Sequence, residues 1–563
     1  MKCLSNTLLF ILFWGTINGY AQADFITNGS RQYDIIDRLQ VLLGNDSVLN
    51  FSSVRPLDRR VITERLAHLQ SALAAKHIRL SKADQYNLQL LLQDNFEWTP
   101  NAPIDTALPI KQLFSQHALT HTAQFGIGKK DFSLFINPVG AYQTGSDNQL
   151  AQRTFLNTRG FYLRGKLGKN IGFYSYYRTQ QERNPLYVQQ YVQQYNAVPG
   201  VGYFKKMAEG GYDYFDGRGG ITVRASKGID LAFVYDKVFI GDGFRSLILA
   251  DGSQSYLHLK LNARFWKFNY HNIFAELTSA FKPTLEGDFL RPKKYMAFHY
   301  LDFQLTKRIN IGFYENVIFG RQNGFDFNYL NPVIFYQTAQ QQLGSPDKLT
   351  LGFNAKANVG KRTQLYSQLV INEFLINEIL HYRNGFWSNK QALQVGGKMV
   401  NFLGVPNLDV QGEINLIRPF VYSHRDSVGT FSHYNQPLAH PLGANLKEFI
   451  AIVKYQPIPR LHLLGKLIYT RQGLDSANRN FGSNIFRSYN DNQGILYGYK
   501  TAGGKLSTIL IASLQAAYEV LPNIFLDANV FLRNQKIAGQ VPFNSQLVSL
   551  GLRVNMQRRN FDF

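Results

Sequence analysis

The chain has 563 residues, of which 45% are hydrophobic and 14% aromatic, while only 17% are charged. This much apolar surface excludes intrinsic disorder, and a mean hydropathy of −0.21 argues against a helical membrane protein. Lysine and arginine total 60 against 38 acidic residues, a formal net charge of +22, which favours an anionic partner.

Residues 1–23 have the features of a secretory signal. Lys2 precedes an apolar run from Leu8 to Trp14, and the small-residue triplet Ala21-Gln22-Ala23 follows. The run is shorter than the ~20 residues that a helix needs to cross a bilayer, so we expect cleavage after Ala23 and not a membrane anchor. Cys3 would leave with the signal. The exported chain would then have no cysteine, which excludes disulfides, cysteine catalysis and cysteine metal sites.

Residues 24–112 are predicted to form a small helical region followed by a linker. Apolar residues recur at helical spacing in three segments, at 35–43, 61–73 and 88–92. Ser81 is the expected N-cap of the third helix, with Asp84 as a variant of the capping box. Prolines within 97–112 mark the linker. We interpret the apolar stripes as helix packing that needs no ligand.

In residues 113–563 the apolar residues recur at every second position, which predicts β-strands with one apolar and one polar face. The clearest examples are 257–263, 351–359, 408–416, 524–532 and 548–556. The strands are about 10 to 15 residues long, whereas strands of soluble proteins centre near five or six. A tilted crossing of a bilayer needs ~9–11 residues or more. The pattern therefore predicts an all-β, transmembrane antiparallel outer-membrane barrel.

Short turns and long loops alternate along this region. Eight short turns are expected near 168–170, 226–228, 265–267, 307–308, 360–362, 404–406, 457–459 and 521–523. The longer segments between them include 182–215, 279–292, 322–346, 422–444 and 473–502. This asymmetry is typical of outer-membrane barrels, whose sheet must close because lipid tolerates no open edge.

With both termini at the short-turn end, the eight turns join sixteen strands, and one further strand precedes and one follows them. The expected barrel therefore has about 18 strands, which is wide enough for a water-filled lumen. If the lumen is filled, we expect the helical region or inward-folded loops to fill it. An open pore and a plugged barrel both remain open as alternatives.

Three stretches of the barrel region are similar to the outer-membrane capsule-assembly family known as Wzi, in the form found in Bacteroidetes. They are GDGFRSLILADGS followed by SYLHLKL (241–261), NYLNPVIFYQTAQQQLGSPDKLTLGF (328–353) and QLVINEF (368–374). RPLDRRVITERL (55–66) resembles the region that precedes the barrel in that group. The resemblance implies a monomeric barrel of about 18 strands, with helices near its periplasmic end. It also implies a surface lectin that attaches exported capsular polysaccharide to the cell, although some relatives are associated with gliding motility.

A polysaccharide site without metal needs flat aromatic faces for sugar rings, and Arg, Asn and Gln for hydroxyls and carboxylates. Two long loops supply both kinds of side chain. The candidates are Arg183, Tyr187, Tyr191, Tyr195, Tyr203 and Tyr212 in the first loop, and Arg479, Phe481, Arg487, Tyr489, Tyr497 and Tyr499 in the second. The alternative is that these rings fill the cores of their own loops or form the aromatic girdle at the membrane interface.

Other groups of residues give weaker evidence for a functional site. The glycines of 217–220 and 241–243 do not lie between a parallel strand and a helix, so we interpret them as barrel bends or loop joints and not as phosphate cradles. His424, His433 and His440, with Asp426 nearby, match no known metal-ligand spacing. The chain offers no evident nucleophile and histidine set for a hydrolase. Asp347 and Glu373 are expected to be lumen-facing carboxylates paired with Arg or Lys. We therefore expect no enzyme, metal or cofactor.

Two hypotheses about function follow. The first is an outer-membrane lectin that binds capsular or other acidic polysaccharide and anchors it outside the cell. The second is an outer-membrane pore, or a component of gliding or secretion machinery, without lectin activity. Outer-membrane lipid, including lipopolysaccharide, is an expected partner, and nucleic acid is not. The ending Phe561-Asp562-Phe563 resembles the signal read by the outer-membrane insertion machinery.

Overall fold

The computed structural model describes most of the chain. The described residues are 24–69, 73, 78–99, 106–108, 125–129, 131–168, 170–282, 289–321, 324–344, 347–373, 375–492 and 494–563. The predicted signal, including Cys3, and most of the predicted linker lie outside these residues. None of the described helices is long and apolar enough to cross a bilayer.

The N-terminal region contains the helices that the sequence predicts. They are α1 (Arg31–Leu43), α2 (Arg59–Ala67) and α4 (Lys82–Asp94). Ser81 caps α4, and the reciprocal bond to Asp84 completes the capping box as expected. Buried leucines and isoleucines of the three helices pack into one small core, which includes Ile36, Leu66 and Leu91.

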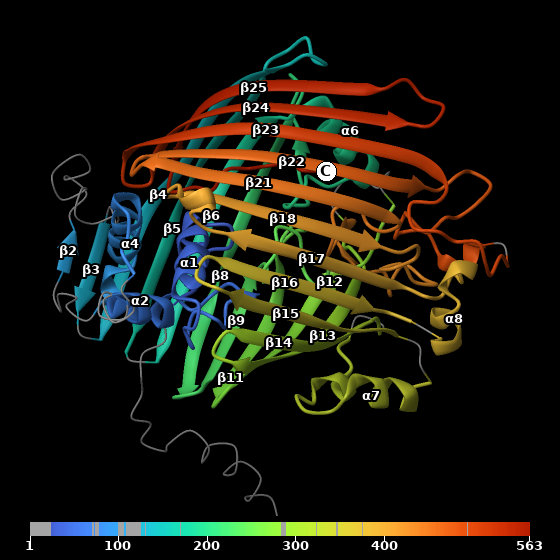
Figure 1. The fold of residues 1–563 in the computed structure, drawn as a ribbon, viewed down its shortest axis with the longest axis horizontal. Coiled ribbons are helices and arrows are strands. Elements are labelled where there is room, and N and C mark those ends of the chain that lie inside the picture. Colours follow the sequence, from blue (N-terminus) through green and yellow to red (C-terminus); the bar gives the residue numbers. More distant parts are fainter. Residues whose placement is uncertain are drawn as a thin grey trace, which may run out of the picture.

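The described residues include eighteen strands that close into an antiparallel barrel (Figure 1). They are β4 (Phe132–Asp147), β5 (Thr154–Leu167), β6 (Ile171–Arg183), β8 (Tyr212–Ser226), β9 (Ile229–Asp236), β11 (Tyr256–Phe265), β12 (Phe268–Thr278), β13 (Lys293–Thr306), β14 (Ile309–Phe319), β15 (Lys348–Val359), β16 (Thr363–Ile371), β17 (Gln391–Met399), β18 (Leu408–Ile417), β21 (Leu446–Ile458), β22 (Leu461–Leu474), β23 (Lys505–Leu521), β24 (Ile524–Ile537) and β25 (Phe543–Val554). β25 pairs with β4 and closes the sheet.

All eight predicted short turns join neighbouring strands at one end of the barrel, and β4 and β25 are the additional first and last strands. The strand count and the two-ended arrangement of the sequence analysis are therefore confirmed. We call the other end, where the long connections lie, the outer end.

The two faces of the wall follow the predicted alternation. Leu257 and Leu259 are 39% and 38% exposed, whereas the intervening His258 and the following Lys260 are buried. Leu550, on β25, is 62% exposed. Apolar side chains thus cover the outside of the barrel and polar ones line its inside, which is the arrangement that lipid outside a wide barrel requires.

Shorter elements complete the fold. They are β1 (Val54–Arg55), β2 (Thr106–Leu108), β3 (Phe125–Lys129), β7 (Lys205–Lys206), β10 (Phe239–Ile240), β19 (Ser432–His433), β20 (Gln436–Pro437), α6 (Leu186–Tyr195), α7 (Tyr336–Gln342) and α8 (Ile376–Leu380). β3 pairs with the first part of β4, and β2 pairs with β3, so these two strands extend the wall at the short-turn end.

The N-terminal helices dock into the short-turn end of the barrel (Figure 1). Arg31 of α1 pairs with Glu519 of β23 at 2.7 Å, and Asp37 of α1 accepts from Lys398 of β17 at 2.8 Å. Arg38 bonds Asp84 within the helical region, and it also reaches across to the barrel. Ion pairs on several sides therefore hold the region in place.

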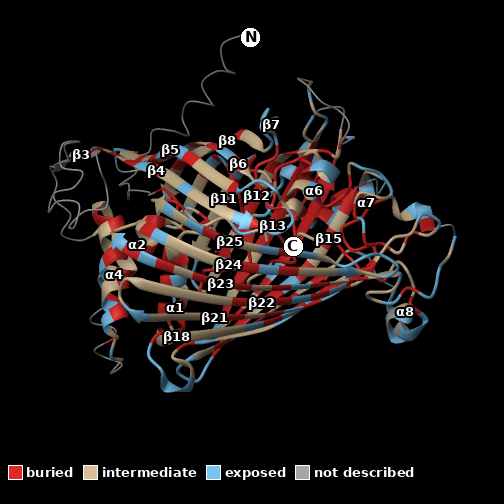
Figure 2. Cartoon of the chain, turned by 90° about the horizontal axis from the view of Figure 1, so that it is seen from above, coloured by how far each residue is buried: buried red, intermediate tan, exposed pale blue. Residues whose placement is uncertain are grey.

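Segments from several other parts of the chain occupy the lumen. The β9–β11 connection, residues 237–255, folds inward until β10 pairs with β1 of the N-terminal region. α6 packs against inward-facing isoleucines of β21, β22 and β23. Residues 555–563, beyond β25, turn back into the barrel, where Arg559 pairs with Glu182. Figure 2 shows buried positions concentrated in the interior and toward the outer end.

The terminal aromatics that resemble an insertion signal therefore lie in the lumen and not on the last strand. Phe563 contacts the rings of Tyr187 and Tyr191, and Phe561 lies beside Phe563. The role of these residues in insertion stays a prediction.

Candidate functional site

Two connections at the outer end lie side by side. One joins β16 to β17 (residues 372–390), and the other joins β22 to β23 (residues 475–504). Their backbones are bonded to each other: the Trp387 N–H donates to the Leu496 carbonyl at 3.0 Å, and the Tyr499 N–H donates to the Gly385 carbonyl at 2.9 Å. This pairing fixes the aromatic side chains of both connections in one place.

Four rings from these two connections form what we call the outer platform: Phe386, Trp387, Tyr489 and Tyr497. The ring centroids of Trp387 and Tyr489 are 5.2 Å apart, and those of Phe386 and Tyr497 are 5.5 Å apart. Tyr497 is 46% exposed, and the other three rings are half-buried. The platform therefore presents partly open aromatic surface at the outer end.

A buried cation and a second layer of rings support the platform. The Lys390 ammonium lies 3.8 Å from the Tyr489 ring centroid, and it donates to Glu373 at 2.8 Å. Phe420 contacts Trp387 from one side and buried Tyr499 from the other. These contacts hold the rings rigidly, which reduces the entropy lost when a flat ligand stacks on them.

Two arginines of the second predicted loop lie near the platform: Arg479 contacts Tyr499, which supports it, and Arg487 is two residues before Tyr489. Arg479 stacks over Phe481 and Tyr499, with its guanidinium carbon 4.7 Å and 5.3 Å from their ring centroids. Arg487 bonds the Ser476 carbonyl at 3.2 Å and pairs with the exposed Asp491 at 3.4 Å. Burial raises the pKa of Tyr489 to about 12, so its hydroxyl keeps its proton at physiological pH.

The structure brings together the predicted residues of the second loop. Phe481, Tyr489, Tyr497 and Tyr499 are all in or next to the platform, with both arginines nearby. Sequence reasoning missed Phe386, Trp387 and Lys390, because the β16–β17 connection was not recognised as a long loop. The available signal was the run Phe386-Trp387-Ser388-Asn389-Lys390 between two strands, with two adjacent aromatics and a lysine.

The first predicted loop divides into an inner and an outer part. Tyr187, Tyr191 and Tyr195 lie on α6 inside the lumen, and Tyr187 is only 6% exposed. The Tyr187 ring stacks on Phe531, and its hydroxyl donates to the Phe561 carbonyl at 2.9 Å. This ring offers no open face, so the core-filling alternative describes it.

The outer part of that loop is more accessible. Tyr203 is 40% exposed beneath the Arg291 guanidinium, and Tyr212 packs edge-on against Phe204. Arg183 bonds the carbonyls of Arg153 and Glu209, so it holds loop backbone together. The two predicted loops touch where Tyr195 meets Phe486, with ring centroids 5.8 Å apart.

The expected carboxylate pairs are present. Asp347 accepts from Arg321 at 2.7 Å and also from the Tyr329 hydroxyl, and Glu373 accepts from Lys390. Both therefore have structural partners, but the expectation that Asp347 faces the lumen is wrong. Its partner Tyr329 packs with Val317 and Phe319, which alternate along β14 with the lumen-facing Ile318.

The three loop histidines form hydrogen bonds with separate partners. His424 bonds Asp426, His433 accepts from the Thr278 N–H, and His440 bonds Glu448. Within the described part of the chain, no cluster of three or more acidic, His or Cys side chains could hold a metal ion.

The two glycine motifs also have structural positions. Gly217 to Gly220 lie inside strand β8, and Gly241 to Gly243 lie in the inward-folded 237–255 segment. Neither position is the joint between a parallel strand and a helix that a phosphate cradle requires.

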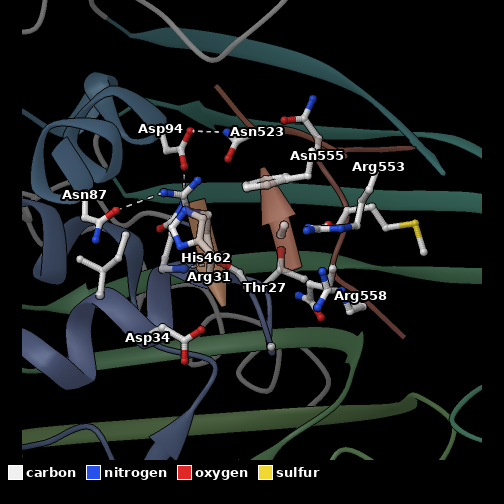
Figure 3. A pocket seen from close by; sticks show the side chains of 18 of the residues that line it. Thr27, Arg31, Asp34, Asn87, Asp94, His462, Asn523, Arg553, Asn555 and Arg558 are labelled. Atoms are coloured by element: carbon white, nitrogen blue, oxygen red, sulfur yellow. Dashed lines mark hydrogen bonds between the residues drawn. The ribbon is translucent and has the colours of Figure 1, made fainter. Parts of the chain in front are cut away.

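The short-turn end holds a cavity of about 410 Å³ between the N-terminal helices and the wall. Figure 3 shows Arg31, His462, Arg553 and Arg558 around it. Each of its arginines already has a carboxylate partner: Arg31 pairs with Glu519, and Arg553 and Arg558 share Asp527. The cavity is a charge-compensated seam between the helical region and the barrel, and the outer platform is the stronger candidate site.

No family model and no curated protein sequence matches the chain. Among solved structures, the chain is similar to Wzi of Escherichia coli, described as an outer membrane protein involved in group 1 capsule assembly and a carbohydrate-binding β-barrel. The TM-score is 0.54 at 12% identity, covering 96% of this chain and 100% of that one.

Two structures from Pseudomonas aeruginosa also match, with lower scores. OprD has a TM-score of 0.40 at 10% identity, covering 74% of this chain and 94% of that one. OpdK, solved with vanillate, has a TM-score of 0.42 at 7% identity, covering 75% of this chain and 98% of that one. At these identities, the likeness to Wzi shows an outer-membrane barrel fold and does not by itself assign a ligand.

Proposed function

We propose that this protein is an outer-membrane lectin that binds acidic polysaccharide at its outer end and holds it on the cell surface. The observation that carries the proposal is the outer platform, a rigid group of partly exposed rings flanked by Arg479 and Arg487. The fold shared with Wzi, a protein described as carbohydrate-binding, supports the same assignment. The proposed role is attachment without catalysis, performed by a monomer.

The chemistry of the platform suits an acidic sugar. The apolar C–H face of a pyranose ring stacks on Trp387 or Tyr497, while a neighbouring guanidinium takes a uronate carboxylate through two parallel N–H···O bonds. Arg487 is the better suited of the two arginines to bind such a carboxylate, because its charge partner Asp491 is 53% exposed. A ligand carboxylate can therefore take the place of Asp491. A buried ion pair would not permit this exchange so readily.

The test is binding of alginate, a polymer of uronates, to the purified protein in detergent. We expect Trp387→Ala and the double change Tyr489→Ala with Arg487→Ala each to weaken binding about tenfold or more, which corresponds to ~1.4 kcal/mol. Trp266→Ala is the matched control, since Trp266 is 77% exposed but lies in the turn between β11 and β12 at the opposite end. Affinity that is unchanged in the platform variants, with the barrel still heat-resistant, would reject the proposed site.

A cell-level experiment tests the role. In a deletion strain we expect surface polysaccharide to be shed into the medium, and complementation with the Trp387→Ala chain to restore the barrel but not full attachment. If attachment, motility and surface polysaccharide are all unchanged in the deletion strain, the lectin proposal fails.

The pore alternative makes a different prediction. An empty barrel of 16–18 strands holds an aqueous channel, but here α6, residues 237–255 and residues 555–563 occupy the lumen. We expect no steady, large conductance when the protein is inserted in planar bilayers. Steady large channels would favour the pore.

A further inference from the structure

The connection between β14 and β15 lies against the outside of the barrel wall. We call residues 324–344 of this connection the outer clip; it contains α7 and appears beside β13 in Figure 1. Tyr329, Tyr336 and Ala339 of the clip pack on side chains of β13 and β14, among them Tyr295 and Val317. The wall residues that alternate with these, such as Phe298, Tyr300 and Ile318, pack with segments in the lumen. The clip therefore covers the face of the wall that points away from the lumen.

The tip of the clip reaches deep along the wall. The Tyr270 hydroxyl donates to the Pro332 carbonyl, and Tyr270 is the third residue of β12. Phe268, two residues earlier in β12, stacks with Phe303, and the exposed Trp266 lies next to Phe268. These three rings form an aromatic girdle at the short-turn end. Two strand residues span about 7 Å. Since such girdles mark the membrane interface, the tip lies at the depth of the hydrocarbon.

The irregular backbone of the tip is supplied with hydrogen-bond partners. Asn331 Oδ1 accepts from the N–H groups of Val333 and Ile334, at 3.0 Å and 3.3 Å. Glu315, which faces outward from β14, accepts from the N–H groups of Tyr336 and Gln337 at 2.9 Å and 3.0 Å. Pro332 has no N–H, and its carbonyl is bonded to Tyr270. Non-helical backbone needs such pairing in lipid, because each unsatisfied polar group there costs several kcal/mol.

The large side chains that the tip turns away from the wall are apolar, and the exposed Asn328 and Asn331 lie between them. Phe327, Val333 and Phe335 are 79%, 82% and 75% exposed, and Leu330 is 41% exposed. None of residues 327–344 is charged, although charged residues make up 17% of the chain. Exposed polar side chains follow along α7, which leads back toward the outer end, at Gln337, Thr338, Gln341 and Gln342. Polarity thus increases in the direction in which the clip leaves the hydrocarbon.

The clip also covers polar side chains on the outer wall. His299 of β13 packs under the Tyr336 ring, with centroids 4.0 Å apart, and Glu315 is only 6% exposed. Left uncovered, an imidazole and a carboxylate on a lipid-facing wall are costly. The clip replaces that polar patch with the apolar surface of Phe327, Val333 and Phe335, which continues the apolar outer wall.

From these observations we propose that the tip of the outer clip, residues 327–335, is immersed in the bilayer and that its partner is the acyl chains of lipid. The clip is then part of the membrane-embedded wall and not an extracellular loop. This inference concerns a surface away from the outer platform, and it holds whether or not the platform binds glycan.

A spin label tests the proposal, because the sequence contains a single cysteine, Cys3. In a chain carrying Cys3→Ser, we would label Val333→Cys and reconstitute the protein in vesicles of phosphatidylcholine and phosphatidylglycerol. Collision rates with oxygen, which concentrates in lipid, and with a water-soluble nickel chelate are then measured. Leu514→Cys is the lipid-facing control, being 69% exposed on the outside of β23, and Val541→Cys is the aqueous control, being 90% exposed between β24 and β25.

We expect the label at residue 333 to match the Leu514 control, with oxygen accessibility several-fold above that of the chelate. A match to the Val541 control would overturn the proposal, because the tip would then be in water. Low accessibility to both reagents would overturn it as well, since a second protein molecule would then cover the tip. Phe335→Trp, with quenching by brominated lipid, gives the same discrimination if the labelled chain does not insert.

Discussion

Asp242 joins three parts of the molecule at one point in the lumen. Its carboxylate accepts from Lys356 of β15 at 2.8 Å and from Ser53 of the N-terminal region at 2.8 Å, while Asp242 itself belongs to the inward-folded 237–255 segment. Asp242 and Lys356 are 3% and 1% exposed. This pair therefore couples the helical region, the lumen segment and the barrel wall.

Asp242→Asn removes the charge that compensates buried Lys356. Loss of one partner from a buried ion pair costs about 3–5 kcal/mol, so we expect a clear loss of resistance to urea unfolding in detergent. Asp34→Asn is the matched control, because the Asp34–Lys454 pair is 62% and 42% exposed and surface pairs contribute about 0–1 kcal/mol. Equal effects from the two changes would contradict the assigned role of Asp242.

Residue types alone identified part of the outer platform. Tyr489, Tyr497 and Arg487 were found because a lectin needs rings and guanidinium groups in exposed loops. Trp387 and Lys390 were not found, since their position beside Tyr489 depends on backbone pairing between connections about a hundred residues apart in sequence. Such pairing leaves no local signal.

At the scale of elements, α6 illustrates what a composition argument overlooks. Tyr187, Tyr191 and Tyr195 follow one another at intervals of four residues, with Val188 and Val192 between them. That spacing places the side chains on one side of a helix and predicts packing, whereas counting rings predicts a binding loop. The structure has the helix, and Val188 is fully buried against the isoleucines of the wall.

Val188→Asp should release α6 from the wall. An ionised carboxylate at this position would lie among the isoleucine side chains of the wall, and burial of a charge in apolar surroundings is strongly unfavourable. We expect amide hydrogen exchange in residues 186–195 to rise at least about tenfold, which corresponds to ~1.4 kcal/mol of lost docking. The strands should stay protected. Gln190→Asp, on the exposed side of the same helix, is the control and should leave exchange unchanged.

The wall elements were predictable for a physical reason. Lipid on one side and a polar lumen on the other impose strict alternation, so strands such as 257–263 and 548–554 show it. The predicted end of the last strand is wrong, because β25 stops at Val554 and Met556 is buried in the interior. The lumen segments have no such constraint. Within residues 237–255 the sequence predicts only a barrel bend or loop joint at Gly241 to Gly243. Burial among other segments, as for Leu247 and Leu249, leaves no period in the sequence.

At the scale of the whole molecule, the net charge of +22 is distributed over both ends of the barrel. Exposed lysines and arginines occur at the short turns, for example Lys361 and Arg362, and at the outer end, for example Lys205, Arg383 and Lys500. Cations at the short-turn end suit the phosphate groups of lipid, and cations at the outer end suit an external anionic polymer.

The outer-end cations make the binding of an acidic polymer sensitive to salt. Between about 0.1 M and 1 M salt the Debye length falls from ~10 Å to ~3 Å, so exposed charges such as Arg383 and Lys500 cease to act over a distance. We expect alginate affinity to fall about tenfold or more over this range. Binding that depends on ring stacking alone would hardly change.

Charge-reversal variants test which end of the barrel attracts the acidic polymer. Arg383→Glu combined with Lys500→Glu should weaken alginate binding at low salt and flatten its salt dependence, because exposed rim charges act mainly through long-range attraction. Lys361→Glu, the matched change in a turn at the opposite end, should leave binding as it is. If the Lys361 variant loses as much affinity as the outer-end variant, the attraction belongs to the total charge of the molecule, and the polymer is not bound at the outer end.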